Sequence, residues 1–136
     1  MYKRQILRSA EAAGVHGVII PKRNSVTLNY TVAKTSAGAI EYVPVVKVAN
    51  LPAAIDELKS RGVWIFGADM DGTDYTALDY SGSIALVIGS EGKGIGRLVR
   101  EKCDFIASLP MRGKINSLNA SVAAGILMFE AAKHRN

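Results

Sequence analysis

Runs of valine, isoleucine and leucine alternate along the chain with segments in which apolar residues recur at helical spacing. The apolar runs predict short strands over 17–20, 43–48, 63–67, 83–88 and 104–109. Helical spacing predicts helices over 5–13, 32–39, 51–61, 95–102 and 117–133. Strands that alternate with helices are typical of an α/β domain, with a mainly parallel sheet and helices on both of its faces.

Local signals sharpen three of these elements. Asn50 is placed to cap the helix over 51–61, and Gly62 is placed to end it. Residues 68–82 are rich in Asp, Gly and Thr, which predicts a polar loop. The last helix carries an apolar face made by Leu118, Val122, Ile126 and Phe129.

Composition limits the class of protein. A chain of 136 residues with 49% apolar residues is one folded domain, and its apolar runs are far shorter than the roughly 20 residues of a membrane span. The single cysteine, Cys103, cannot form an internal disulfide, and no signal peptide opens the chain, so we expect a cytoplasmic protein. His16 and His134 lack partners at metal-ligand spacing, so we expect no metal. The aspartates of 69–74 lack the spacing of a calcium loop and favour turns instead.

The charge distribution suggests a partner that carries phosphates. The net charge is +5, and the basic residues of the C-terminal half follow a short acidic stretch. Five basic residues are candidates for salt-sensitive contacts with a nucleic acid: Lys22, Arg23, Arg97, Arg100 and Arg112.

Three segments have the composition of functional sites. Residues 89–96 form a glycine-rich loop between a buried strand and a helix, but Lys93 is followed by Gly94, so the segment is not a P-loop. Residues 109–121 place Ser117, Asn119 and Ser121 at the start of a helix, where capping accounts for only one of them. In residues 6–15, Arg8 and Glu11 are three positions apart and could simply pair at the surface.

Taken together, these segments resemble the SpoU/TrmH family of RNA ribose 2′-O-methyltransferases, within the SPOUT class. The resemblance rests on ILRSAEAAGVHGVIIPK, ALVIGSEGKGIGRLVREKCD and LPMRGKINSLNASVAAGILMFEA, in that order. The run TSAGAIEYVPVVKVANL is similar to the RlmB branch, which methylates a guanosine of 23S ribosomal RNA. The resemblance implies a deep C-terminal trefoil knot, S-adenosylmethionine as cofactor, and a homodimer with its active site at the subunit interface.

The resemblance also implies roles for individual residues. Cofactor-binding positions of the family correspond to Gly89, Leu109, Met111 and Leu118. Catalytic positions correspond to Arg8, Glu91, Ser117 and Asn119, with Arg8 matching the arginine proposed to activate the ribose hydroxyl. Because the pKa of arginine exceeds about 12, Arg8 could instead hold a phosphate and stabilise the developing alkoxide.

Two other functions stay open at this stage. One is a transfer-RNA 2′-O-methyltransferase of the same family, because the second and third motifs are shared by both kinds of enzyme. The other is an RNA- or nucleotide-binding domain without catalysis.

The N-terminus departs from the family pattern. The family has an Asn-x-Gly stretch before its arginine, whereas this chain has Tyr2 and Arg4 at those places. The first five residues match the translation of a sequencing adapter, GTGTATAAGAGACAG, from a GTG start. We therefore expect 1–5 to be a non-native leader and 6–136 to be a methyltransferase domain that lacks its first strand and the N-terminal RNA-binding domain.

Overall fold

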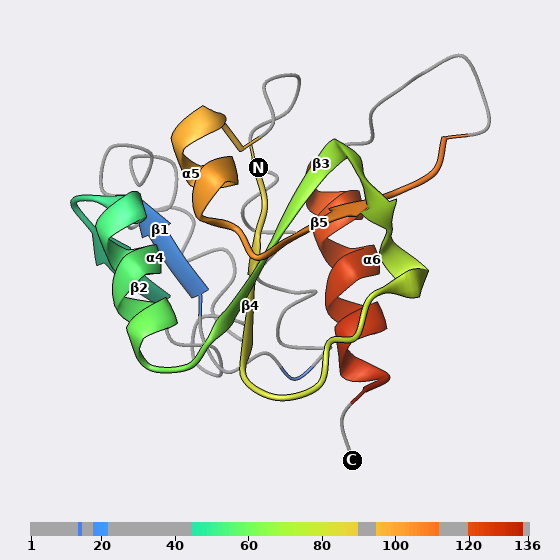
Figure 1. Cartoon of the computed structure of the whole chain (residues 1–136), viewed down its shortest axis with the longest axis horizontal. Helices are drawn as coiled ribbons and strands as arrows, with labels where there is room; N and C mark the ends of the chain where they lie inside the picture. The colour runs from blue at the N-terminus through green and yellow to red at the C-terminus, as the bar shows by residue number, and fades with distance from the viewer. Residues whose placement is uncertain (1–13, 15–17, 22–44, 90–94, 112–119, 135–136) are drawn as a thin grey trace, which may run out of the picture.

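A computed structural model describes residues 14, 18–21, 45–89, 95–111 and 120–134 (Figure 1). The strands are β1 (Val18–Pro21), β2 (Val45–Val48), β3 (Trp64–Asp74), β4 (Ile84–Val87) and β5 (Phe105–Ser108). The helices are α4 (Leu51–Ser60), the 3₁₀-helix η2 (Tyr75–Ala77), α5 (Arg97–Lys102) and α6 (Ala120–Ala132). The helices expected over 5–13 and 32–39 lie outside the described residues.

All strand pairs among these residues are parallel, which confirms the predicted α/β class. The strand β3 lies between β4 and β5, and β1 pairs with β2. Neighbouring side chains of a strand point to opposite faces of the sheet. Phe66 packs in a cluster with Ala131 of α6, whereas Gly67 faces Ile95 and Cys103 at the two ends of α5. Helices therefore cover both faces of this sheet, with α6 on one side and α5 on the other (Figure 1).

The helix α4 forms as its local sequence predicts. The Asn50 side-chain oxygen accepts a hydrogen bond from the Ala53 amide at 3.0 Å, and Pro52 lies in the first turn, where its missing N–H costs nothing. The helix ends where Gly62 adopts a φ of +85°, a left-handed conformation that favours glycine.

The prediction of a polar loop over 68–82 is wrong for its first half. The strand β3 continues through Asp74, because Thr73 and Asp74 pair again with Ala107 and Ser108 of β5. Tyr75–Ala77 then forms η2, whose start is capped by Asp74. The sequence does not reveal this part of the strand, because most of its side chains beyond Ala68 are polar.

The face that α6 buries also differs from the predicted one. Val122 and Phe129 are 50% and 49% exposed, whereas the buried side chains belong to Ala124, Leu127, Met128 and Ala131. Leu118 lies outside the described residues. Apolar residues lie on all sides of this helix, so periodicity alone could not select the face that meets the sheet.

An aromatic cluster on β3 forms the centre of the core. The Phe66 ring lies 4.8 Å from the rings of both Tyr80 and Phe105, measured between centroids. The Tyr80 hydroxyl donates a hydrogen bond of 2.6 Å to the Tyr75 carbonyl oxygen. Burial, followed by the nearby charge of Glu130, raises the pKa of Tyr80 to about 12. No helix within the described residues has both the length and the apolar character needed to cross a membrane.

We expect Tyr80 to make the folded protein sensitive to alkali. Because its pKa is higher in the folded chain than the value near 10 of an unfolded chain, its stabilising effect is complete below pH 10 and is lost as the pH rises towards 12. Tyr80→Phe should lower the free energy of unfolding by about 0.5–1.5 kcal/mol at pH 8, because one hydrogen bond is lost. Above pH 10 this difference should shrink, as measured by urea unfolding across the pH range. The control Tyr75→Phe should leave the alkaline loss in place, and an unchanged difference at all pH values would contradict the prediction.

Candidate functional site

The carboxyl ends of β4 and β5 meet at one edge of the sheet. Both strands run parallel to β3, and Gly67 of β3 pairs with Val87 of β4 and with Ile106 of β5. Gly89 follows the end of β4, and Leu109 directly follows β5. Ligands of parallel α/β proteins bind at this edge, because the loops that leave the strands gather there.

The structure brings three of the sequence-predicted cofactor residues to this edge. Gly89, Leu109 and Met111 all lie beyond the last paired residues of β4 and β5, and all three are partly exposed. Of the other predicted site residues, Arg97 and Arg100 are described, and eight lie outside the described ranges: Arg8, Lys22, Arg23, Glu91, Arg112, Ser117, Leu118 and Asn119.

Gly67 allows the residues at the two ends of α5 to pack directly on β3. A Cβ atom at this position would lie 2.7 Å from the Cys103 sulfur and 2.8 Å from Cδ1 of Ile95. Burial, followed by the neighbouring charge of Asp104, raises the pKa of the Cys103 thiol, which therefore stays neutral as the packing requires. Sequence analysis did not single out Gly67, although a glycine inside a strand often marks a close approach.

Residues Asp69–Gly72 leave the β3–β5 ladder and return to it, and we call them the β3 excursion. Ala68 and Thr73 both pair with Ala107, so the four residues between them have no partner in the ladder. The excursion lies tightly against β5, because a Cβ at Gly72 would meet the Ile106 carbonyl oxygen at 2.5 Å. The Ser108 hydroxyl also donates a hydrogen bond of 2.8 Å to the Met70 carbonyl oxygen.

Arg100 binds this excursion from α5. One terminal nitrogen lies 2.6 Å from the Asp69 carboxylate, and the other lies 2.6 Å from the Asp71 carbonyl oxygen. The Arg100 side chain is 36% exposed. By contrast, Arg97 is 92% exposed and has an ion pair of 3.2 Å with Glu101 in the next turn of the same helix. Of the two predicted RNA-binding residues that the structure describes, only Arg97 extends into solvent.

The aspartates of 69–74 serve different purposes. Asp69 pairs with Arg100, whereas Asp74 accepts hydrogen bonds from the amide and hydroxyl of Thr76, and the amide bond lowers the pKa of Asp74. The turn interpretation thus holds for Asp74, whereas Asp69 accepts a local hydrogen bond of 2.8 Å from the Met70 amide and also binds Arg100. Within the described residues, no three His, Cys, Asp or Glu side chains are grouped so as to hold a metal ion.

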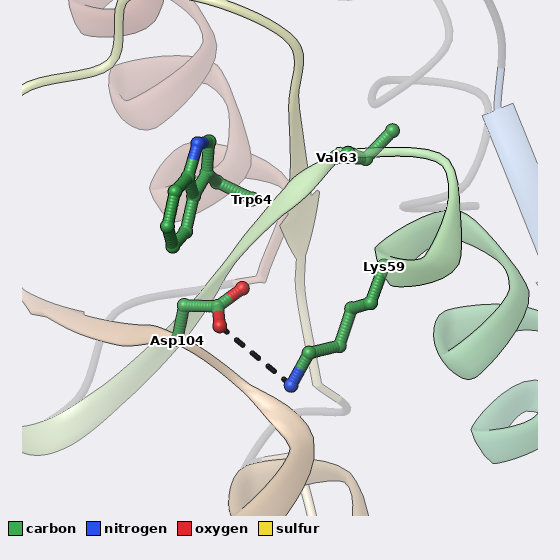
Figure 2. A pocket seen from close by; sticks show the side chains of 5 residues that line it. Lys59, Val63, Trp64 and Asp104 are labelled. Atoms are coloured by element: carbon green, nitrogen blue, oxygen red, sulfur yellow. Dashed lines mark ion pairs between the residues drawn. The ribbon is translucent and has the colours of Figure 1, made fainter.

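A shallow hollow lies at the opposite end of β3. It is lined by Lys59, Gly62, Val63, Trp64 and Asp104 (Figure 2). The Lys59 ammonium lies 3.6 Å from the Asp104 carboxylate, and it donates to the Lys102 carbonyl oxygen at 2.8 Å. The second Asp104 oxygen accepts from the Ile65 amide at 2.7 Å. These polar groups join α4 to the sheet, so the hollow is a structural junction rather than the candidate site.

Comparison with known proteins places the chain in a family. The profile of the SpoU rRNA methylase family matches residues 5–129, and the chain therefore belongs to this family. The TrmH-family protein YacO of Bacillus subtilis is 56% identical over 132 residues, which cover 96% of this chain and 53% of YacO. The chain thus spans about half the length of the curated relatives that it matches.

Solved structures give the same result. AviRb of Streptomyces viridochromogenes, a SpoU methyltransferase in complex with the cofactor AdoMet, superimposes with a TM-score of 0.88 and 30% identity. The match covers 98% of this chain and 55% of AviRb. An AdoMet-bound rRNA methyltransferase of Sinorhizobium meliloti superimposes with a TM-score of 0.89 and 28% identity, over 99% of this chain and 52% of that one.

Proposed function

We propose that this chain is the catalytic domain of an RNA ribose 2′-O-methyltransferase that uses S-adenosylmethionine and acts on a guanosine of 23S ribosomal RNA. The observation that carries the proposal is the match of nearly the whole chain to the AdoMet-bound SpoU methyltransferase AviRb. The 23S target and the 2′ position rest on the motifs of the sequence. A transfer-RNA target is the second candidate, because the name of YacO includes both tRNA and rRNA.

The described edge of the sheet suits the adenosine part of this cofactor. Gly89 and Leu109 lie beyond the strand ladders, so their backbone groups are placed to bond a ligand rather than a neighbouring strand. Leu109 and Met111 are only partly buried, and their side chains can cover an adenine ring. We infer that these three residues, together with Leu118, hold the cofactor.

The protein's own part in the reaction is to position the reactants and move a proton. S-adenosylmethionine supplies a methyl group that its sulfonium has already activated. The chain must hold the ribose 2′-oxygen in line with that methyl group, a role that we assign to Glu91, Ser117 and Asn119. Arg8 either removes the hydroxyl proton or stabilises the developing alkoxide while it holds a phosphate. The basic residues Lys22, Arg23, Arg97 and Arg112 supply phosphate contacts to the RNA. The sequence also predicts a phosphate contact for Arg100.

We also infer a knotted, dimeric assembly. The family resemblance implies a deep trefoil knot in the C-terminal part of the chain. An electron-density map that traces an unthreaded chain would rule the knot out. The exposed side chains of Val122 and Phe129 give α6 an apolar outer face, which supports a contact between two copies.

The function is tested by cofactor binding and methyl transfer. Calorimetry should detect S-adenosylmethionine binding to the chain, and Gly89→Glu should weaken it by about a hundredfold or more, because a side chain would occupy the cofactor's place. The control Ser83→Glu adds the same charge at the exposed opposite end of β4 and should leave the affinity unchanged.

Transfer is measured with labelled cofactor on unmodified 23S RNA and on unmodified tRNA. Label in a 2′-O-methylguanosine of 23S RNA is the expected result. Label only in tRNA would favour the second candidate, and binding without transfer to either RNA would favour a non-catalytic domain.

Arg8→Ala should separate chemistry from binding. We expect the single-turnover rate of methyl transfer to fall by roughly 10²–10³, the typical loss for a contact made in the transition state, with unchanged cofactor affinity. Glu11→Ala is the matched control, because Glu11 is the surface partner that the sequence predicts for Arg8, three positions away. If both variants lose the same small amount of activity, Arg8 is a surface partner of Glu11 and not a catalytic residue.

Phe129→Glu should shift the protein from dimer to monomer in sedimentation experiments, because a carboxylate would be buried in the contact between two copies. Trp64→Glu changes an aromatic residue of similar exposure that lies at the start of β3 and not on α6. It should leave the dimer intact. A wild-type chain that sediments as a monomer at micromolar concentration would refute the dimer.

A further inference from the structure

The helix α5 and the end of β5 are both fastened to the same four residues. The β3 excursion, Asp69–Gly72, receives Arg100 from α5 and Ser108 from β5. The glycine-rich loop that begins at Gly89 leads into α5, and Leu109 directly follows Ser108. The excursion therefore joins α5 to the end of the strand that precedes Leu109.

Ile95, just before α5, and Arg100, within α5, are each held against β3. Ile95, the last apolar residue before α5, is buried against Gly67 of β3. Arg100, five residues further on, binds Asp69 and the Asp71 carbonyl oxygen, both at 2.6 Å. Together with the packing of Cys103 on Gly67 and the ion pair between Lys102 and Asp56 of α4, these two contacts hold this helix of six residues in place. Ile95 and Gly96, which directly precede α5, are held in place with it.

The end of β5 is fastened to the same excursion. The Ser108 hydroxyl binds the Met70 carbonyl oxygen at 2.8 Å, and Gly72 lies against the Ile106 carbonyl oxygen with no room for a side chain. A shift of the excursion would thus carry the end of β5, and Leu109 with it. Arg100 reaches the excursion at two of its four residues, and a planar guanidinium is suited to two separate acceptors, whereas a lysine has one small head group.

We propose that Arg100 is a positioning residue for S-adenosylmethionine: through the β3 excursion it fixes the Leu109 side of the cofactor site relative to α5. This inference rests on the proposed function. It replaces the expectation that Arg100 contacts RNA, because both terminal nitrogens of its guanidinium bind acceptors within the domain. Arg100 acts through the excursion and does not itself touch the cofactor.

The test compares four variants of the full chain by calorimetry with S-adenosylmethionine and by binding of a 23S RNA fragment. Arg100→Ala should weaken cofactor binding about tenfold, and Arg100→Lys should lose part of that affinity, because one of the two acceptors is given up. Ser108→Ala, which removes a single exposed hydrogen bond and leaves the fold intact, should weaken it about threefold. Arg61→Ala removes an exposed arginine that pairs with Glu57 and should change nothing.

Steady-state kinetics separates positioning from general loss of structure. The KM for S-adenosylmethionine should rise in the Arg100 and Ser108 variants, while RNA affinity and its salt dependence stay at the wild-type level. The inference is overturned if Arg100→Ala keeps its cofactor affinity and loses RNA affinity, which would make it an RNA contact. It is also overturned if Ser108→Ala binds the cofactor like wild type while Arg100→Ala has merely unfolded. A wild-type chain without any cofactor affinity would instead refute the proposed function, and this inference with it.

Discussion

Parallel pairing of β3 with both β4 and β5 is the constraint on which the rest of the structure depends. Because the three strands share one direction, the residues after β4 and after β5 must emerge at the same edge. Gly89 and Leu109 are 20 positions apart in the sequence and become neighbours of the same strand only through this pairing. The family's cofactor motifs are therefore arranged by the sheet rather than by their own local structure.

The two ends of β3 serve different purposes. Its amino half carries Phe66, whose ring packs against those of Tyr80 and Phe105, and burial of Phe66 and Tyr80 stabilises the sheet against α6. Its carboxyl half is polar and is held by hydrogen bonds and by close backbone approach instead. An edge that must admit a ligand cannot be closed with large apolar side chains, so polar ties such as those of Arg100 and Ser108 hold the chain there without filling the site.

The two arginines of α5 have different surroundings. Arg97 and Arg100 lie on the same short helix, three residues apart, yet Arg97 extends into solvent and Arg100 binds the β3 excursion. Net charge is consistent with an RNA partner, but it does not reveal which arginines are available to that partner. Only the position of Asp69, an acidic residue 31 positions from Arg100, distinguishes them.

The sequence by itself determined the elements whose signals are local. The structure confirms the helix cap at Asn50, the helix end at Gly62 and the strand β4. The sequence could predict these features because each depends only on neighbouring residues. The motifs also sufficed to identify the family, because three segments in order carry more information than any one of them. Only the tertiary structure decided the rest. The second half of β3 is strand because β5 pairs with it, α6 buries Leu127 rather than Phe129 because the sheet lies on that side, and Arg100 binds inward because Asp69 faces it. Each of these outcomes depends on a partner distant in sequence, and no local pattern of residues can reveal such a partner.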